Sequence, residues 1–344
     1  MVALVAVAAT VLALVLALVL AVAVPGPHVH VEPEVSFALP PPAAGCDGAT
    51  SLPGGGARVP LTVSTVDEQV AESVDVCIGG QGPFAFVLDS GAGQSTIDAG
   101  LARRLQLPSA GPASEFAGVG CIGHARPVSV ASWSLDGVPL DPQQLTAARL
   151  PQMGGKGEPV GLLGSDVLSR FGAVRVDFRG GALVLAGPEG QPLGGAAAVT
   201  GPTGSAPAAL TAGAGTTVPL TVITLPGDVS LGVAVRFGRG GRRAFVVDTG
   251  SSQSVVSTSV ADAESLAGTD LAQRQATVCS VITIPLVHSG PWSVPGAALH
   301  PQLLGETDFG TVGLGGIVGL LGSDQLARYG WVVLDYRGAL LVLG

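Results

Sequence analysis

Two short stretches of the sequence have the same order of residue types, residues 86–91 (FVLDSG) and residues 245–250 (FVVDTG). In each stretch, an apolar run typical of a buried strand leads into an acid, a hydroxyl residue and a glycine. A carboxylate that directly follows a buried strand loses hydration energy unless neighbouring groups compensate for it. Two such acids in matching contexts, Asp89 and Asp248, therefore suggest two halves of one site.

Both stretches belong to an internal duplication of about 128 residues. The segment 60–63 (PLTV) recurs at 219–222, an offset of 159 that also relates the two acids. Further along, the segment 161–166 (GLLGSD) recurs at 319–324, an offset of 158. A duplication with one copy of the acid loop in each half predicts two similar lobes.

Composition and repeat boundaries predict five segments. Residues 25–56 and 188–216 are rich in Pro, Gly, Ala or Thr and have little to pack, which is typical of a spacer and a flexible linker. The expected organisation is a membrane anchor or signal peptide at 1–24, a Pro/Gly-rich spacer at 25–56, a first lobe at 57–187, a flexible linker at 188–216 and a second lobe at 217–344.

The N-terminal segment is uncharged from Val2 to Val24. As a helix at ~1.5 Å per residue it would span about 34 Å, enough for a bilayer core. This length favours an uncleaved hydrophobic helix over a cleaved signal, although residues 21–23 (AVA) would suit a cleavage site. The first basic residue is Arg58, so we expect the body to lie outside the cytoplasm, membrane-anchored or secreted.

Charge and cysteine content narrow the class of protein. The formal net charge of −9 argues against nucleic-acid binding, which needs a basic face. The four cysteines, at positions 46, 77, 121 and 279, include no Cys-x-x-Cys pair of a zinc or redox site. In an exported protein an even count suggests disulfides, and four cysteines allow three connectivities.

Short apolar or alternating runs between Gly-rich breaks predict a mainly β fold. In the first copy, strands are expected at 59–65, 70–77, 84–88, 127–135, 173–178 and 182–186. Helices are expected at 97–106 and at 166–171, the second with Ser165 as N-cap and Gly172 just beyond its end. Asp166 and Asp324 would then favour the dipole in a first helical turn. Trp133 and Trp292 are expected in the core on equivalent strands.

The duplicated loops resemble those of the aspartic proteases, in which each lobe gives one Asp-Thr/Ser-Gly loop. In that family a later Leu-Leu-Gly packs beside the loop and supports it, and here this element is present at 162–164 and at 320–322. Its spacing from the acid and the sequence that follows it are similar to those of bacterial retropepsin-like domains. The resemblance covers about 60–186 and 219–343, and it implies two closed β lobes related by a pseudo-two-fold axis.

The resemblance also implies the roles of individual residues. Asp89 and Asp248 would be the catalytic pair. Loop support would come from Ser90, Gly91, Leu162, Leu163 and Gly164 in the first lobe and from Thr249, Gly250, Leu320, Leu321 and Gly322 in the second. Glycines at 91 and 250 let backbone approach the carboxylates closely.

Chemistry explains why two carboxyl groups are needed. Two carboxylates about 3 Å apart cannot both ionise, so they share one proton. The ionised group takes a proton from water while the protonated group donates to a carbonyl oxygen, without any metal or cofactor. A hydroxyl at the fourth loop position often bonds the carboxylate in the family, so Ala92 opposite Ser251 predicts an asymmetric pair.

The Gly-rich stretch 118–123 would, by resemblance, form the flap hairpin of the first lobe; the second lobe carries Cys279 near the position equivalent to Cys121. Because flaps of retroviral-type lobes meet over the cleft, we expect a Cys121–Cys279 disulfide, leaving Cys46 and Cys77 to join the spacer to lobe one. The alternative is that Cys121 and Cys279 are both buried thiols.

The function expected from these observations is that of an aspartic-type endopeptidase acting on an extended peptide or protein substrate. The alternative is a non-catalytic module of the same fold that binds a peptide or envelope component. The absence of any tyrosine before Tyr329 gives this alternative some weight, since a flap tyrosine is common in pepsin-like relatives. We expect the lobes to pair within one chain, as a monomer, rather than between chains.

Overall fold

The computed structural model describes residues 30–32, 45–52, 56–151, 158–186, 210, 215–225, 228–309 and 316–344. The expected anchor or signal at 1–24 and most of the expected linker at 188–216 lie outside these residues. Within the described part of the chain, no helix is long and apolar enough to cross a membrane.

Strands dominate the described residues, so the predicted mainly β class is confirmed. The strands are β1 (His30–Glu32), β2 (Thr50–Ser51), β3 (Gly56–Pro60), β4 (Thr62–Val66), β5 (Gln69–Ile78), β6 (Gln81–Asp89), β7 (Thr96–Asp98), β8 (Ser114–Gly118), β9 (Cys121–Val130), β10 (Trp133–Leu135), β11 (Val138–Leu140), β12 (Gln143–Ala148), β13 (Gly161–Gly164), β14 (Ala173–Asp177), β15 (Ala182–Ala186), β16 (Thr216–Leu225), β17 (Asp228–Phe237), β18 (Arg242–Asp248), β19 (Val255–Ser257), β20 (Ala267–Ala276), β21 (Val281–His288), β22 (Trp292–Val294), β23 (Ala297–Leu299), β24 (Leu303–Thr307), β25 (Ile317–Gly322), β26 (Trp331–Asp335) and β27 (Leu340–Leu343). The helices are α2 (Ala99–Arg104), α3 (Ser165–Leu168), α4 (Thr258–Ala263) and α5 (Ser323–Leu326), with short 3-10 turns η1 (Ser169–Phe171) and η2 (Ala327–Tyr329).

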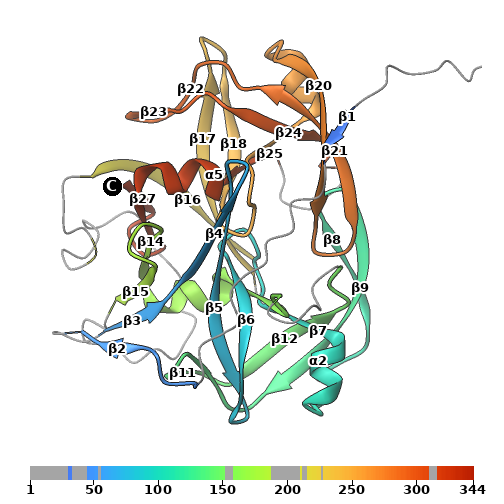
Figure 1. Cartoon of the computed structure of the whole chain (residues 1–344), viewed down its shortest axis with the longest axis vertical. Coiled ribbons are helices and arrows are strands. Elements are labelled where there is room, and N and C mark those ends of the chain that lie inside the picture. The colour runs from blue at the N-terminus through green and yellow to red at the C-terminus, as the bar shows by residue number, and fades with distance from the viewer. Residues whose placement is uncertain are drawn as a thin grey trace, which may run out of the picture. The chain divides into compact units, whose positions relative to one another are not determined.

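Two lobes repeat one strand order (Figure 1). Lobe 1 has the order β11-β10-β5-β6-β13-β7-β12-β9-β8, with β4 paired to β5. Lobe 2 has the order β23-β22-β17-β18-β25-β19-β24-β21-β20, with β16 paired to β17. Every strand of one lobe therefore has a counterpart at the same place in the other, as the duplication predicts.

A third group of strands joins the lobes, in the antiparallel order β2-β3-β15-β14-β26-β27-β16. We call it the connecting sheet. At its centre β14 faces β26, with Ala173 opposite Asp335 and Arg175 opposite Val333. Because 173 and 175 are equivalent to 331 and 333 in the repeat, this register places a pseudo-two-fold axis between the two strands.

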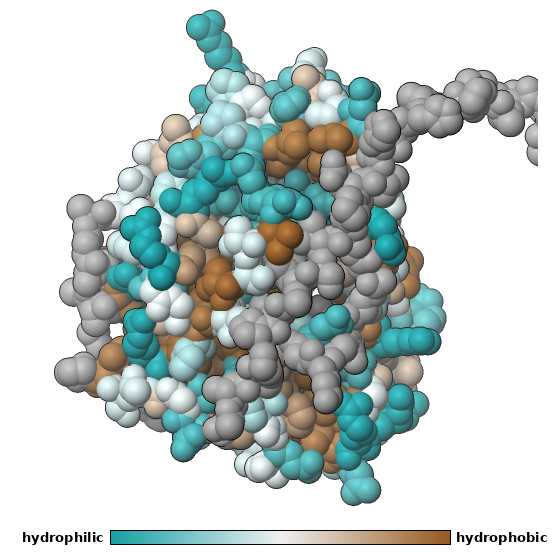
Figure 2. Space-filling view, viewed as in Figure 1, coloured by the Kyte–Doolittle hydropathy of each residue, from teal (hydrophilic) through white to brown (hydrophobic). Residues whose placement is uncertain are grey.

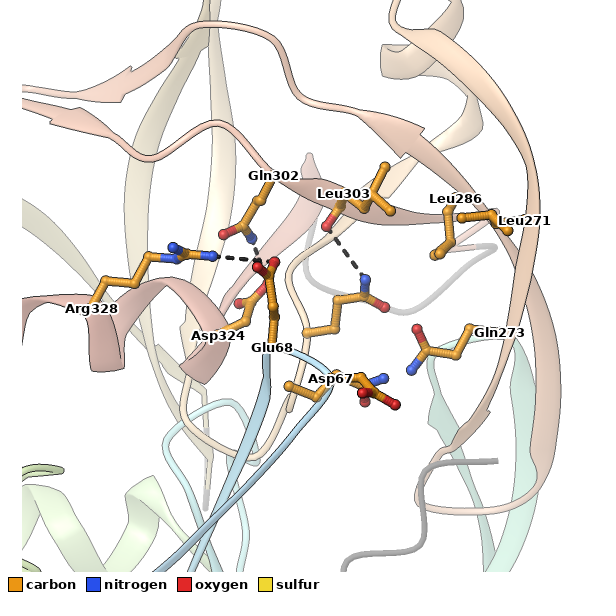
Figure 3. A pocket seen from close by; sticks show the side chains of 11 residues that line it. Asp67, Glu68, Leu271, Gln273, Leu286, Gln302, Leu303, Asp324 and Arg328 are labelled. Atoms are coloured by element: carbon orange, nitrogen blue, oxygen red, sulfur yellow. Dashed lines mark hydrogen bonds and ion pairs between the residues drawn. The ribbon is translucent and has the colours of Figure 1, made fainter. Parts of the chain in front are cut away.

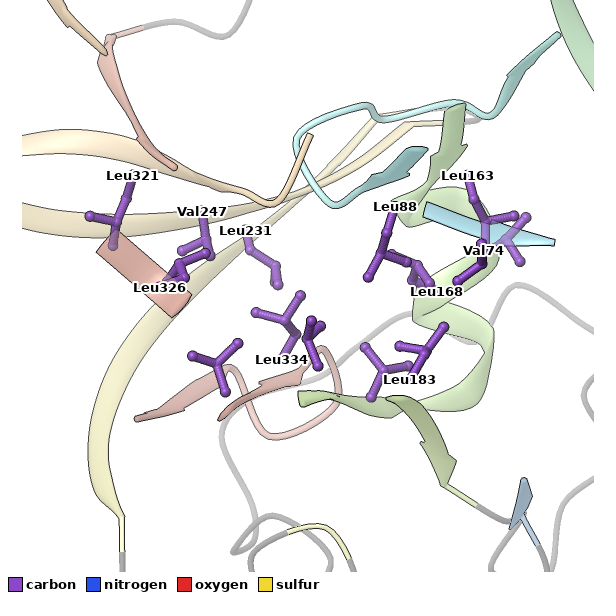
Figure 4. Close-up of a cluster of buried hydrophobic side chains, with 14 of the residues drawn as sticks. Val74, Leu88, Leu163, Leu168, Leu183, Leu231, Val247, Leu321, Leu326 and Leu334 are labelled. Carbon is purple, nitrogen blue, oxygen red and sulfur yellow. The ribbon is translucent and has the colours of Figure 1, made fainter. Parts of the chain in front are cut away.

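One hydrophobic core cluster extends through both lobes and onto the connecting sheet. Figure 4 shows Leu88, Leu163 and Leu168 of lobe 1 on one side and Val247, Leu321 and Leu326 of lobe 2 on the other, with Leu183 and Leu334 of the connecting sheet below them. Full burial of one such side chain contributes about 1.5–3 kcal/mol. The strands that carry the two acids are thus anchored from beneath in the same way.

The predicted core positions of Trp133 and Trp292 are confirmed, because both side chains are buried. The indole N–H of Trp133 donates to the carbonyl of Asp141, and that of Trp292 to the carbonyl of His300. A buried indole therefore keeps a partner for its polar end in both lobes.

Three predicted elements have different bounds in the structure. The helix expected at 97–106 begins only at Ala99, because the Asp98 carboxylate caps it by accepting from the amide of Leu101. The strand expected at 59–65 divides at Leu61, where the chain leaves the connecting sheet and enters lobe 1. The strand expected at 127–135 divides between β9 and β10.

The prediction of Ser165 as an N-cap is wrong. The cap residue of α3 is Gly164, and Ser165 is the first residue of the helix. Its hydroxyl instead contacts the acid loop, because the helix begins directly beneath that loop. The predicted end of the helical region at Gly172 is confirmed, since the chain turns there with a φ of 74°.

Candidate active site

The structure brings the two acid loops together. Asp89 ends β6 and Asp248 ends β18, and their carboxyl groups lie close enough for the charge of Asp89 to raise the pKa of Asp248. Asp89 is partly exposed, whereas Asp248 is only 9% exposed. Two acids 159 positions apart in the chain therefore form one carboxyl pair.

Each carboxyl group packs against the glycine of the opposite loop. A Cβ atom on Gly91 would lie 2.3 Å from Cγ of Asp248, and one on Gly250 would lie 2.3 Å from Cγ of Asp89. Real side chains do not tolerate such distances, so both positions require glycine. The requirement comes from close approach to the partner acid.

The two loops brace each other through their hydroxyl residues. The amide of Ser90 donates to Oγ1 of Thr249 at 2.9 Å, and the amide of Thr249 donates to Oγ of Ser90 at 3.1 Å. The Ser90 hydroxyl donates to the carbonyl of Val247, and the Thr249 hydroxyl donates to that of Leu88. Each hydroxyl thus accepts and donates across the lobe boundary, the arrangement expected for these residues.

Backbone amides also donate to both carboxylates. Oδ1 of Asp89 accepts from the amide of Ala92 at 2.8 Å, and Oδ1 of Asp248 accepts from the amides of Gly250 and Ser251. The Ser251 hydroxyl donates to the carbonyl of Gln253, not to the carboxylate. The missing hydroxyl at Ala92 is therefore not what distinguishes the two acids.

Burial and mutual charge distinguish them instead. Loss of hydration raises the pKa of Asp89, and hydrogen bonds from Ala92 and Asp248 lower it in part. Loss of hydration raises the pKa of Asp248 well above its usual range, and the nearby charge of Asp89 raises it further. Both shifts have the same direction, so the pair holds one proton at a pH at which an isolated aspartate is ionised.

The two Leu-Leu-Gly elements lie beside the acid strands. β13 runs parallel to β6 with Gly164 opposite Asp89, and β25 runs parallel to β18 with Gly322 opposite Asp248. A Cβ at Gly164 would lie 2.8 Å from the carbonyl oxygen of Ala92, and one at Gly322 would lie 2.7 Å from that of Ser251, so each element packs against the acid loop of its own lobe. Of the leucines, 162, 163 and 321 are buried and 320 is partly buried.

Asp166 and Asp324 have a role that the sequence analysis missed. Oδ1 of Asp166 accepts from both the amide and the hydroxyl of Ser95, and Asp324 does the same for Ser254. These carboxylates therefore hold the chain that leaves each acid loop, beyond any effect on a helix dipole. Burial raises the pKa of Asp324 to about 6. Each serine follows its acid by six residues in both copies, a repetition that signals a shared role.

A second missed group lies behind the loops. The Ser165 hydroxyl donates to the carbonyl of Ser90 and bonds the Tyr336 hydroxyl at 2.8 Å. In lobe 2 the equivalent Ser323 lies 3.1 Å from the carbonyl of Thr249 and 2.5 Å from Oε1 of Glu72. Each serine connects the acid loop of its own lobe to a side chain contributed from elsewhere.

Glu72 is a third buried acid near the pair. Its side chain is fully buried, and Oε2 has no hydrogen-bond partner within the described residues. Burial raises the pKa of Glu72 well above its usual range, the Ser323 hydrogen bond lowers it, and the charges of Asp248 and Asp89 raise it further. The repeat could have predicted this burial, because the residue equivalent to Glu72 in the second copy is the apolar Leu231.

Two disulfides are present. Cys121 at the start of β9 bonds Cys279, which lies between β20 and β21, with Cα atoms 6.1 Å apart. This is the pairing expected between the flap hairpins, and it links the lobes. Cys46 bonds Cys77 of β5 and fixes the end of the segment expected as a spacer to lobe 1.

The structure thus has two lobes of one β topology, and each lobe gives one Asp-Ser/Thr-Gly loop to the carboxyl pair. Residues 74–167, which lie in lobe 1, match the family model described as Aspartyl protease. This match covers about a quarter of the chain; it confirms the resemblance found in the sequence and supports aspartic-type peptidase activity in general.

A crystal structure of the aspartic proteinase from Irpex lacteus is similar to this chain, with a TM-score of 0.47 and 11% sequence identity, over 84% of this chain and 97% of that one. A search of curated proteins with the sequence finds no match.

Proposed function

We propose that the protein is an aspartic-type endopeptidase in which Asp89 and Asp248 activate water for hydrolysis of a peptide bond. The observation that carries this proposal is the pairing of the two acids, one from each lobe, in which each carboxyl group packs against the glycine of the other lobe's loop. The bracing of the loops by Ser90 and Thr249 supports it, because a proton can be exchanged between two acids only when their separation is held constant.

The proposed reaction is general acid–base catalysis by the pair. Asp89, ionised, takes a proton from water, and the water oxygen attacks the carbonyl carbon of the substrate. Asp248 donates its proton to the carbonyl oxygen, which gives a tetrahedral diol without net charge. Asp89 then protonates the leaving nitrogen while Asp248 recovers a proton from the diol, so the pair returns to its initial state.

We also propose that one chain forms the complete site and that the β8–β9 and β20–β21 hairpins cover the cleft. The disulfide between these hairpins supports both points, because it fixes the two lobes to each other. Disulfides persist in oxidising compartments, which supports an extracytoplasmic location of the body.

The test is cleavage of an unbiased peptide library by the purified full chain, followed by mass spectrometry. Cleavage between residues of the peptides is expected, together with its loss in Asp89→Asn. A library that stays intact across the acidic and neutral pH range, while peptides still bind, would replace the proposal with the peptide-binding alternative. Sedimentation of the active preparation checks the monomer; activity confined to a dimer would overturn pairing within one chain.

A further inference from the structure

A pocket of about 240 Å³ lies between lobe 2 and the tip of the β4–β5 hairpin, which comes from lobe 1 (Figure 3). Figure 3 shows its polar side chains converging from β4–β5, α5 and the strands of lobe 2. It is lined by Asp67, Glu68, Gln69, Gln253, Leu271, Gln273, Leu286, Gln302, Leu303, Asp324 and Arg328. Because Gln253 belongs to the turn that follows Asp248, this pocket borders the acid loop of lobe 2.

Two glutamines of the pocket have amide oxygens that accept no hydrogen bond from any residue that the structure describes. Nε2 of Gln253 donates to the carbonyl of Leu303, and Nε2 of Gln302 donates to Asp324, so each amide is oriented by its nitrogen. Oε1 of both glutamines is buried and accepts no hydrogen bond within the described part of the chain. Buried acceptors are nearly always bonded in folded proteins. Two such acceptors in one pocket give a ligand that carries N–H donors two groups to bind.

Lobe 1 shows how the first of these oxygens is satisfied when no ligand is needed. Gln94 is equivalent to Gln253, and its Oε1 accepts from the Thr146 hydroxyl at 3.1 Å. The residue of lobe 2 equivalent to Thr146 is Gly305, which has no hydroxyl. The loss of this donor leaves the oxygen of Gln253 without the partner that its counterpart Gln94 has in lobe 1.

The second oxygen differs between the lobes for another reason. Gln143 is equivalent to Gln302, and its Oε1 accepts from the guanidinium of Arg170. The equivalent Arg328 instead pairs with Glu68 at the hairpin tip, at 3.4 Å. Because Arg328 pairs with Glu68 of the β4–β5 hairpin, its guanidinium does not donate to Oε1 of Gln302 as Arg170 does to Oε1 of Gln143.

Charge gives the class of the ligand. The lining contains three carboxyl groups, those of Asp67, Glu68 and Asp324, against the single guanidinium of Arg328. Figure 2 shows hydrophilic residues gathered over the tip of the β4–β5 hairpin and over α5. Leu271 and Leu286 provide an apolar wall, which suits the aliphatic stem of a long basic side chain.

We propose that this pocket binds a basic side chain, arginine or lysine, of the peptide substrate. The N–H groups of the cation donate to Oε1 of Gln253 and of Gln302, and the surrounding carboxylates balance its charge. The inference rests on the proposed function for the identity of the ligand as a peptide, and it adds a preference for a basic residue at one position.

Binding tests the inference separately from cleavage. The full chain carrying Asp89→Asn is titrated with a set of octapeptides, each with arginine, lysine, glutamine or norleucine at one position of a neutral host. At one position, arginine or lysine is expected to bind at least about tenfold more tightly than norleucine, since a site built for hydrogen bonds rejects an analogue that lacks them. Equal affinities at every position, or a preference for glutamine over both cations, would overturn the proposal.

A matched pair of variants locates the effect. Gln253→Leu is expected to remove the tenfold advantage of the basic peptide and to leave the norleucine peptide unchanged. Gln94→Leu, the same change at the satisfied position of lobe 1, should leave both affinities as they were. An equal loss in the two variants, or none in Gln253→Leu, would overturn the assignment to this pocket. If basic peptides are preferred but never cleaved by the unmutated chain, the pocket stands and the proposed endopeptidase activity fails.

Discussion

Lobe 1 and lobe 2 have equivalent residues in direct contact with the two acids, but different residues packed behind the acid loops. The loops, their glycines and the cross-bracing hydroxyls are matched almost atom for atom. Behind them, Glu72 of β5 corresponds to Leu231 of β17, and Phe178 corresponds to Tyr336. The comparison indicates that shared chemistry keeps the contact layer symmetric, while the layer behind it is free to diverge.

The largest effect is expected at the acids themselves. Asp89→Asn and Asp248→Asn should each reduce kcat/KM by about 10²–10⁴-fold, because the mechanism needs one proton acceptor and one donor. Hydrolysis of a fluorogenic peptide measures the loss, and circular dichroism of each variant checks that the fold is intact. A variant that keeps more than about a tenth of the activity would show that the lobes do not contribute equally.

The glycines come next. Gly91→Ala and Gly250→Ala place a Cβ against the acid of the other lobe, so both should lower activity by about 10²-fold through displacement of a carboxyl group. Steady-state kinetics on the same peptide provide the comparison. Gly241→Ala is the control, since a Cβ there meets no atom of the described residues within 4 Å. If the two variants lost clearly unequal amounts of activity, the two acid loops would not be functionally equivalent.

Glu72 tests the divergent layer. Glu72→Leu installs the residue of the other lobe and removes a buried carboxyl group, one oxygen of which has no partner among the described residues, so the free energy of unfolding at pH 7 should rise by about 1–3 kcal/mol. The Ser323 hydroxyl keeps the carbonyl of Thr249 as an acceptor. Urea unfolding measures the change, and a loss of stability at pH 7 would contradict it.

The pH dependence of this gain has a definite sign. Because the pKa of Glu72 is raised in the folded state, that state holds the proton more tightly than the unfolded chain. The unmutated protein therefore has the full contribution of this group below the ordinary carboxyl pKa and loses it as pH rises towards the folded value. The advantage of Glu72→Leu should thus increase from about pH 4.5 upward. Glu72→Gln, which also cannot ionise, should show the same trend.

The smallest effect is expected at Tyr336. Tyr336→Phe converts this position to the residue type of its counterpart Phe178 and removes the hydrogen bond to Ser165. A loss of about 1 kcal/mol in unfolding free energy is expected, because Ser165 keeps its bond to Ser90. Tyr329→Phe is the control, since its hydroxyl bonds Ala298 at the surface. If Tyr336→Phe and Tyr329→Phe lost the same unfolding free energy, the buried hydrogen bond would contribute no more stability than the exposed one.

Local signals in the sequence predicted the parts of the site that repeat. The acid loops, the Leu-Leu-Gly elements and the core tryptophans stand in the same order in both copies, and each is defined by a few adjacent residues. Alternating runs located β5, β14 and β15 to within a few residues because their two faces or their length match simple strand patterns.

Contacts between distant segments were not predictable in this way. Glu72 lies within an expected strand, but its partner Ser323 is 251 residues further along the chain. The reach of the β4–β5 hairpin to Arg328 likewise depends on how the lobes pack, which no local pattern encodes. Ser165 was predicted to be a helix cap because serine often caps a helix through local hydrogen bonds. In the structure its hydroxyl instead donates to the carbonyl of Ser90 in the acid loop, which is distant in sequence.

The Cys121–Cys279 bond has a topological consequence. The chain from 121 to 279 passes through the connecting sheet, and the disulfide joins its two ends, so the two lobes form a closed covalent ring. A peptide in the proposed cleft, beneath the hairpins and above the acid loops, is encircled by this ring. Such a peptide enters by sliding in from an end or as a narrow hairpin, because hairpins joined by a disulfide cannot separate fully to admit the middle of a long, folded chain. Access to the cleft is then governed by the free ends and loops of a substrate as much as by its sequence.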